Sequence, residues 1–146
     1  MAAGYQLTIK NADETIELST KEQNGSAEIQ TVVFKMNTLD DNTRNRADAV
    51  RGEITITGPI TKENKEKTKR LAKWAMDANK KTLYRNVVIV VYDGENCSGD
   101  VLRRYEVDNM FVIDYEENFG TSADEGKYTL FMAQKEGNEK KEVFSS

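Results

Sequence analysis

The stretch Val87-Val88-Ile89-Val90-Val91-Tyr92 is an unbroken apolar run. A strand of this composition is apolar on both faces, so both faces need to be covered by other parts of the fold. The run therefore predicts a central strand. A turn is predicted over residues 93–100, and two more amphipathic strands, residues 101–107 and 110–116, then complete a three-strand meander.

A helix is predicted ahead of this meander, over about residues 62–78, with Thr61 as its N-cap. One side of this helix is apolar at helical spacing, whereas residues 62–70 are almost wholly charged. Trp74 is expected to be a core anchor rather than a ligand platform. The expected packing face of the helix consists of Leu71, Trp74, Ala75 and Ala78.

Further strands are predicted from alternating apolar and polar residues at 5–10, 15–18, 52–58 and 128–133, with a last short strand ending at residues 143–144. Residues 29–36 are denser in apolar side chains, which favours a central position for that strand as well. The fold class is therefore mainly β with one helix. We expect residues 1–146 to form one domain, a β-barrel or strongly curved sandwich flanked by the helix.

An extended polar loop is predicted over residues 37–49, between two of these strands. Polar loops of this length usually have a function, since a strand can be turned around with far fewer residues. Its acidic and amide side chains lack the glycine and terminal glutamate of an EF-hand, so no metal site is expected. The candidate contact residues of the loop are Leu39, Asp40, Asp41, Arg44, Arg46 and Asp48.

Composition excludes several classes of function. The 21 Lys and Arg residues are interspersed with 25 Asp and Glu, which gives a net charge of -4 and no basic field for specific nucleic-acid binding. The chain has no histidine and a single cysteine, so the usual zinc sites and histidine-dependent triads cannot form. No cofactor is expected, and no apolar run approaches the ~18 residues that would indicate a membrane span.

Two weaker enzymatic signals remain, and both are read as structural. Asp114 and Glu116 would lie on one face of a strand, as a general acid and base do, but such pairs arise by chance in so acidic a chain. Cys97 lies in a turn without a neighbouring lysine or histidine to lower its pKa, so a bystander thiol is expected. The chain is therefore predicted not to be an enzyme.

The number of strands raises the question of what satisfies their edges. Unpaired strand edges promote aggregation, so a barrel must close on itself or its edges must pair with neighbouring copies. Both solutions are open at this point.

The order of elements resembles that of the inner-tube proteins of contractile injection systems, the haemolysin-coregulated protein and phage tail-tube-like family. The similarity is densest over residues 83–92 and 105–115. It implies hexameric rings formed by strand pairing and stacked into a hollow tube, with the 37–49 loop reaching toward the neighbouring ring. Sheath and baseplate or spike proteins of the same machine are the implied partners. The chain lacks the histidine and aromatic-rich C-terminal segment of the secretion-system members, so phage tail, secretion system and free particle all remain open.

The leading functional hypothesis is thus a structural tube subunit, assembled in the cytoplasm or released as part of a particle. A lumen must pass cargo without binding it, and Thr8, Lys10, Thr55 and Thr57 are candidate lumen residues. The alternatives are a monomeric β-barrel that binds a protein or small ligand through the 37–49 loop, and a histidine-free hydrolase acting through Asp114 and Glu116.

Overall fold

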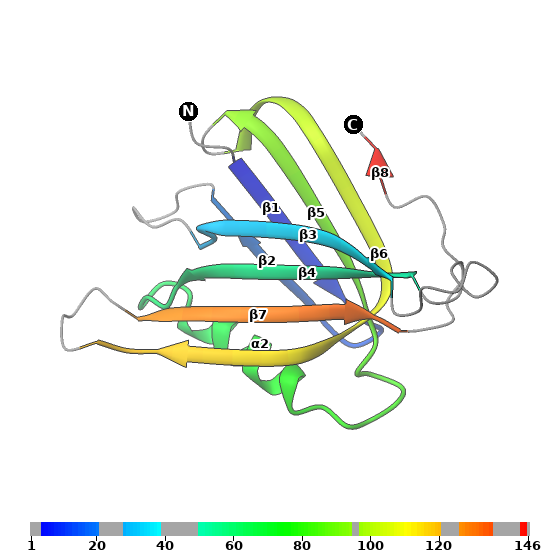
Figure 1. Cartoon of the computed structure of the whole chain (residues 1–146). Helices are drawn as coiled ribbons and strands as arrows, with labels where there is room; N and C mark the ends of the chain where they lie inside the picture. The colour runs from blue at the N-terminus through cyan, green and yellow to red at the C-terminus, as the bar shows by residue number, and fades with distance from the viewer. Residues whose placement is uncertain are drawn as a thin grey trace.

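The computed structural model describes residues 4–20, 28–38, 50–94, 97–120, 126–135 and 144–145. Within these ranges the chain forms eight strands and one helix (Figure 1). In chain order they are β1 (Gly4–Lys10), β2 (Thr15–Ser19), β3 (Thr31–Thr38), β4 (Val50–Pro59), α2 (Lys65–Ala75), β5 (Arg85–Gly94), β6 (Ser98–Asn118), β7 (Lys127–Gln134) and β8 (Phe144–Ser145).

All strands belong to one antiparallel sheet with the order β2-β1-β5-β6-β7-β4-β3, and β8 adds to β6 outside this path. The long strand β6 pairs with β5 along its first part and with β7 along its second part. Because β6 bends between these parts, the two halves of the sheet cross each other (Figure 1). The strongly curved, mainly β fold with one flanking helix is confirmed. The barrel is not closed by hydrogen bonding, since β2 and β3 end the path without pairing with each other in the described part of the chain.

The core lies between the two halves of the sheet. Alternate residues of β1 and β2 point inward, as the period of two requires, and meet those of β4 and β7. Fully buried members include Leu7, Ile9, Ile16, Leu18, Ile54, Ile56, Leu130 and Met132.

Strand β6 replaces the two separate strands predicted at residues 101–107 and 110–116. The intervening Asn109 has a φ of 56°, a left-handed conformation that asparagine tolerates better than most residues. Met110 follows directly and pairs with both Arg85 of β5 and Gln134 of β7. Asp108-Asn109 therefore bends the strand instead of ending it.

Two strands were predicted to be central in the sheet, and one of these two predictions is confirmed. Strand β5 is internal and pairs with β1 and β6, as its apolar run indicated. The central position predicted for residues 29–36 is wrong, because β3 ends the sheet. Val32 and Phe34 pack against the core, whereas Val33 is 56% exposed. The apolar density of β3 therefore reflects an exposed apolar surface in addition to the core.

Helix α2 is shorter than the predicted helix 62–78. Thr61 and Asn64 form a turn ahead of it: the Thr61 N–H donates to Asn64 Oδ1 at 2.8 Å, and the Asn64 N–H donates to Thr61 Oγ1 at 3.2 Å. Beyond its end, the Asp77 carboxylate accepts hydrogen bonds from the Asn79 N–H (2.9 Å) and the Thr82 hydroxyl (2.8 Å), which hold the pKa of Asp77 below its usual value.

This turn determines which of the predicted face residues pack. Leu71 and Trp74 are buried in the core, and Ala75 is half-buried at the last position of the helix. Ala78 is exposed and lies outside the helix, because the turn held by Asp77 has already redirected the chain. The buried residues of α2 are Thr68, Leu71 and Trp74, so the packing face begins earlier in the helix than predicted and does not reach Ala78.

Candidate assembly surfaces

The β2 end of the sheet is covered by the chain itself. Arg70 of α2 donates to the backbone oxygen of Thr15 at 2.8 Å, and its guanidinium lies 3.7 Å from the Glu14 carboxylate. At the other end of β2, the Glu28 N–H donates to the Ser19 oxygen at 2.9 Å, and the Glu28 carboxylate accepts from the Ser19 N–H at 3.3 Å. Backbone groups at both ends of β2 are therefore satisfied within one subunit.

Residues 28–30 connect the covered β2 end to the other half of the sheet. The Gln30 N–H donates to the Thr57 oxygen of β4 at 2.7 Å, and Lys67 of α2 forms a 3.0 Å ion pair with Glu28. The buried Tyr128 hydroxyl donates a hydrogen bond to the backbone oxygen of Glu28 at 2.8 Å. Burial, and secondarily the charge of Glu28, raises the pKa of Tyr128, so this phenol stays protonated and able to donate.

The β3 end of the sheet is different, since β4 is the one strand that pairs with β3 among those described. The outward side chains of β3 include Val33, which is 56% exposed, and the exposed Lys35, while Met36 is 38% exposed. An edge strand with exposed apolar side chains is a ready template for pairing with another chain.

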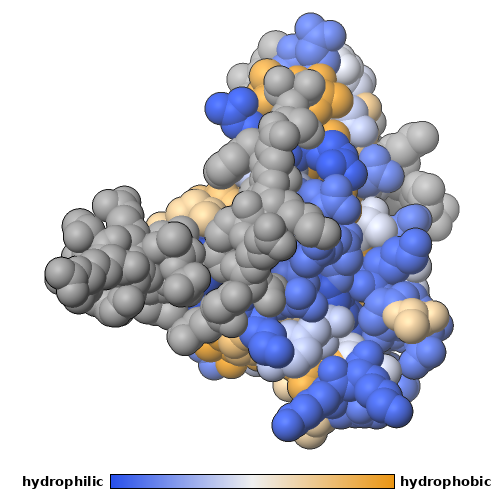
Figure 2. Space-filling view, turned by 90° about the vertical axis from the view of Figure 1, so that its right-hand side faces the viewer, coloured by the Kyte–Doolittle hydropathy of each residue, from blue (hydrophilic) through white to orange (hydrophobic). Residues whose placement is uncertain are grey.

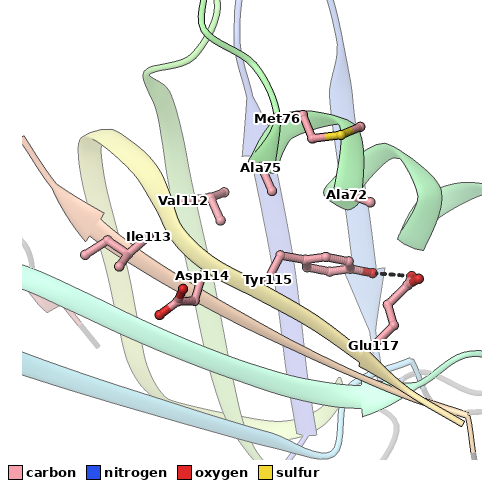
Figure 3. A pocket seen from close by; sticks show the side chains of 8 residues that line it. All are labelled: Ala72, Ala75, Met76, Val112, Ile113, Asp114, Tyr115 and Glu117. Carbon is pink, nitrogen blue, oxygen red and sulfur yellow. Dashed lines mark hydrogen bonds between the residues drawn. The ribbon is translucent and has the colours of Figure 1, made fainter.

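A third surface is the groove between α2 and the second part of β6, with a volume of about 410 Å³. Figure 3 shows the Tyr115 ring lying beneath the helix, with its hydroxyl directed to Glu117. The hydroxyl donates to Glu117 at 2.8 Å and lies 3.3 Å from the Thr68 oxygen, and partial burial raises the pKa of Tyr115. The lining consists of Ala72, Ala75, Met76, Val112, Ile113, Asp114, Tyr115 and Glu117. Sequence reasoning missed this groove, because it joins a helix and a strand that are far apart in the chain.

The candidate lumen residues lie on the face of the sheet that points away from the core. In β1, Thr8 and Lys10 alternate with the buried Leu7 and Ile9. In β4, half-buried Thr55 and Thr57 likewise alternate with the buried Ile54 and Ile56. The two strands belong to opposite halves of the sheet with the core between them, so a single lumen can be faced by one of the two pairs and not by both. The lumen role of these residues stays a prediction.

Asp114 and Glu116 are exposed and lie opposite Phe131 and Thr129 of β7. Asp114 lines the groove and Glu116 does not, so the structure does not bring the two carboxylates into one cavity. The half-buried thiol of Cys97 donates a hydrogen bond to the backbone oxygen of Tyr5 at 3.3 Å. The loop residues Leu39, Asp40, Asp41, Arg44, Arg46 and Asp48 all lie outside the described residues.

The described ranges contain neither a cluster of three or more potential metal-ligating side chains nor a helix with the length and apolarity to cross a bilayer.

These observations define a class of protein in which a single antiparallel sheet is folded over and a helix covers one of its ends. The chain is similar to Hcp1 from Salmonella typhimurium, with a TM-score of 0.56 and 10% identity over 90% of this chain and 81% of that one. It is also similar to the tail of an empty gene transfer agent (GTA) particle with C6 symmetry, with a TM-score of 0.50 and 10% identity over 96% and 92% of the two chains. A chain of the native gene transfer agent virion gives a TM-score of 0.50 and 11% identity over 96% and 95%.

The Hcp-like, tail-tube-like fold implied by the sequence resemblance is thereby confirmed. No family model matches the sequence, and neither does any curated protein.

Proposed function

We propose that this chain is a structural subunit that forms hexameric rings, and that these rings stack into the inner tube of a contractile injection system. The observation that carries the proposal is the unequal treatment of the two ends of its tail-tube-like sheet. The β2 end is covered within the subunit, whereas in the described part of the chain β3 has a strand on one side only and carries exposed apolar side chains. Pairing of the β3 edge with a different surface of a neighbouring copy would remove an aggregation hazard, and such a head-to-tail contact repeated between copies would build a ring.

The similar solved structures support a particle role and not catalysis, since two of them are a tail with C6 symmetry and a virion. Six copies per ring would be in keeping with the symmetry of that tail. The proposed partners are sheath, baseplate or spike proteins of the same machine. The proposed location of the chain is the assembled particle.

Purified full-length chain tests the proposal directly. Negative-stain micrographs are expected to show six-fold rings with a central hole, and tubes at higher concentration. A species that remains monomeric in light scattering at every concentration would overturn the proposal.

Asn37 and Thr38 of the predicted loop 37–49 belong to β3, so the remaining segment, residues 39–49, is proposed to mediate stacking. Its removal separates the tube hypothesis from the binding-module alternative. Thr38 and Val50 are paired across β3 and β4, so a two-residue Asn-Gly turn can replace residues 39–49. The tube hypothesis predicts intact rings that no longer stack. A folded monomer that has lost a binding partner would instead support the alternative.

A further inference from the structure

The second part of β6 has a side on which no described strand pairs with it. At Met110, β6 pairs with Arg85 of β5 on one side and with Gln134 of β7 on the other. Over residues 112–118 it pairs with β7, and among the described strands none takes the side that β5 has left. We call this side the open side of β6. Peptide groups that point to the open side can pair with a further strand.

The two faces of β6 differ along this open side. Figure 3 shows Tyr115 beneath α2 and Asp114 directed away from the helix. Glu116 shares the face of Asp114, because the intervening Tyr115 pairs with buried Leu130. Neither Asp114 nor Glu116 forms an ion pair with a described lysine or arginine. The open side thus has the groove on the helix face and two exposed carboxylates on the face away from the core, here called the outer face.

Strand β3 carries complementary side chains. The register of β3, β4, β7 and β6 places Val33 and Asp114 in one row on the outer face. Lys35 lies on that face too, is exposed and forms no ion pair with a described carboxylate. Met36, on the face of β3 that packs in the core through Phe34, is 38% exposed. An acceptor for β3 would therefore present carboxylates on its outer face and an apolar hollow on the other.

The number of strands fixes the direction in which two copies meet. The strands β6, β7, β4 and β3 are four in number and each is antiparallel to the next, so β3 runs opposite to β6. Rotation about a ring axis preserves strand directions from copy to copy. Strand β3 of one copy therefore meets β6 of the next as an antiparallel pair, with outer face beside outer face.

The first part of β6 is the competing acceptor. Figure 2 shows apolar side chains gathered near the top of the view, the end at which Figure 1 places the β5–β6 hairpin and β8. Strand β8 already pairs with this part of β6, at Arg104 and Tyr105. Its Glu106 carboxylate already forms a 3.1 Å ion pair with Arg104. The second part of β6 is thus the better acceptor for the lysine of β3.

We propose that the open side of β6, residues 112–118, receives β3 of a neighbouring copy as an antiparallel strand. The inference deepens the proposed ring and rests on it. Lys35 of one copy lies opposite Glu116 of the next and diagonal to Asp114, positions from which opposite charges attract across a sheet. The contact joins two different surfaces, so repetition between copies closes a ring when the rotation allows it.

The same register accounts for the groove. With Lys35 opposite Glu116, Met36 lies opposite Tyr115, whose ring lines the groove. The helix side of the groove includes Met76, which is 77% exposed in the single subunit. The contact therefore covers apolar side chains on one face of the joined strands and pairs charges on the other.

Charge reversal of each surface tests the contact. Lys35→Glu places a carboxylate against the acidic face of β6, and Asp114→Lys with Glu116→Lys places cations against Lys35. Each variant alone is expected to raise the concentration required for rings by at least about tenfold in analytical ultracentrifugation. Mixed in equal amounts, the two variants are expected to assemble again. Alternation around a ring of six gives every contact an opposite-charge pair.

Matched controls lie on the other half of the sheet. Lys10→Glu makes the same change as Lys35→Glu at an exposed lysine of β1. Asp13→Lys with Glu17→Lys reverses two exposed carboxylates of the β1–β2 hairpin. Both controls are expected to assemble at the wild-type concentration.

The outcomes separate this inference from the proposed function. A wild-type chain that never assembles overturns both. Wild-type rings together with unchanged assembly of the two β3 and β6 variants overturn the contact and leave the ring intact, as does failure of their mixture to recover. Equal loss of assembly in the controls would show a general effect of charge and likewise overturn the inference. Recovery in the mixture supports it, since independent folding defects in two variants do not correct each other.

Discussion

The β2 end of the sheet is covered within the subunit, whereas the β3 end is exposed in the described part of the chain. At β2, an arginine from α2 and the backbone and carboxylate of Glu28 satisfy strand groups within the subunit. In the described part of the chain, β3 pairs with β4 on one side and with no strand on the other, and its outward-facing Val33 is exposed. Both ends face the same physical problem, which is the cost of unsatisfied backbone groups and exposed apolar surface.

This difference indicates where assembly has been prevented and where it has been left open. A subunit with two open ends would polymerise through strand pairing in an uncontrolled way. A helix that covers one end restricts pairing to the other end and to surfaces such as the groove. Helix α2 is thus proposed to direct assembly as well as to complete the core.

The largest expected effect follows from removing the anchor of this cover. Trp74 is 2% exposed, its indole N–H donates to the Leu83 oxygen at 2.7 Å, and its ring lies 5.2 Å from the Arg85 guanidinium. Trp74→Ala is expected to lower the free energy of unfolding by about 3–5 kcal/mol, because it leaves a cavity and a buried carbonyl without its donor. Urea denaturation measures the loss. Met76→Ala, at a 77% exposed side chain on the same turn, is the control and should cost less than about 0.5 kcal/mol.

A second effect concerns the pH dependence of the link between Tyr128 and Glu28. The pKa of Tyr128 is raised above the usual value of about 10, so the unfolded state ionises first as the pH rises. The stabilisation from this phenol is complete below pH 10 and declines above it, by at most about 1.4 kcal/mol per pH unit, until the folded pKa is passed. Chemical denaturation from pH 8 to 11 measures the decline.

Tyr128→Phe is the matched variant for this measurement. At neutral pH it is expected to be less stable by about 1 kcal/mol, because the Glu28 oxygen loses its donor. Above pH 10 its stability should fall less steeply than that of the wild type, so the two curves converge. Parallel curves over the whole range would contradict the assignment to Tyr128.

A third, smaller effect tests the cover of β2 itself. Arg70→Ala removes the hydrogen bond to the Thr15 oxygen and the exposed ion pair with Glu14. The expected loss is about 0.5–1 kcal/mol, since exposed ion pairs contribute little. Hydrogen exchange should show faster opening confined to β2 and its neighbours. Exchange that accelerates throughout the sheet would indicate a global role for Arg70 instead.

The sequence predicted the strands well where one face is buried, because alternation in residues such as Leu7 and Ile9 follows directly from burial. It failed where a single residue decides the outcome. Asp108-Asn109 is a turn signal in most contexts, and nothing local indicates that Asn109 bends a strand paired on both sides of the bend. The end of the helix was likewise set by hydrogen bonds to Asp77, which side-chain patterning does not reveal.

The candidate surfaces were less accessible to sequence reasoning than the fold. The apolar density of β3 was visible, but a sequence does not distinguish an apolar side chain that packs in the core, such as Phe34, from an exposed one such as Val33. The groove depends on α2 lying against β6, and the cover of β2 depends on Arg70 meeting Thr15 from a distant part of the chain. Such contacts become visible when the topology is known.

The last prediction compares the two edges by placing the same side chain on each. Lysine on a strand edge opposes pairing with another chain, and it costs little where the original side chain is exposed. Val33→Lys on β3 and Glu17→Lys on β2 replace exposed residues near the middle of their strands. Both are expected to change the free energy of unfolding by no more than about 0.5 kcal/mol. They should differ in assembly: Val33→Lys is expected to prevent rings in negative-stain images, whereas Glu17→Lys should leave them intact. If Glu17→Lys abolished rings and Val33→Lys did not, the covered and open ends of the sheet would have to exchange their proposed roles.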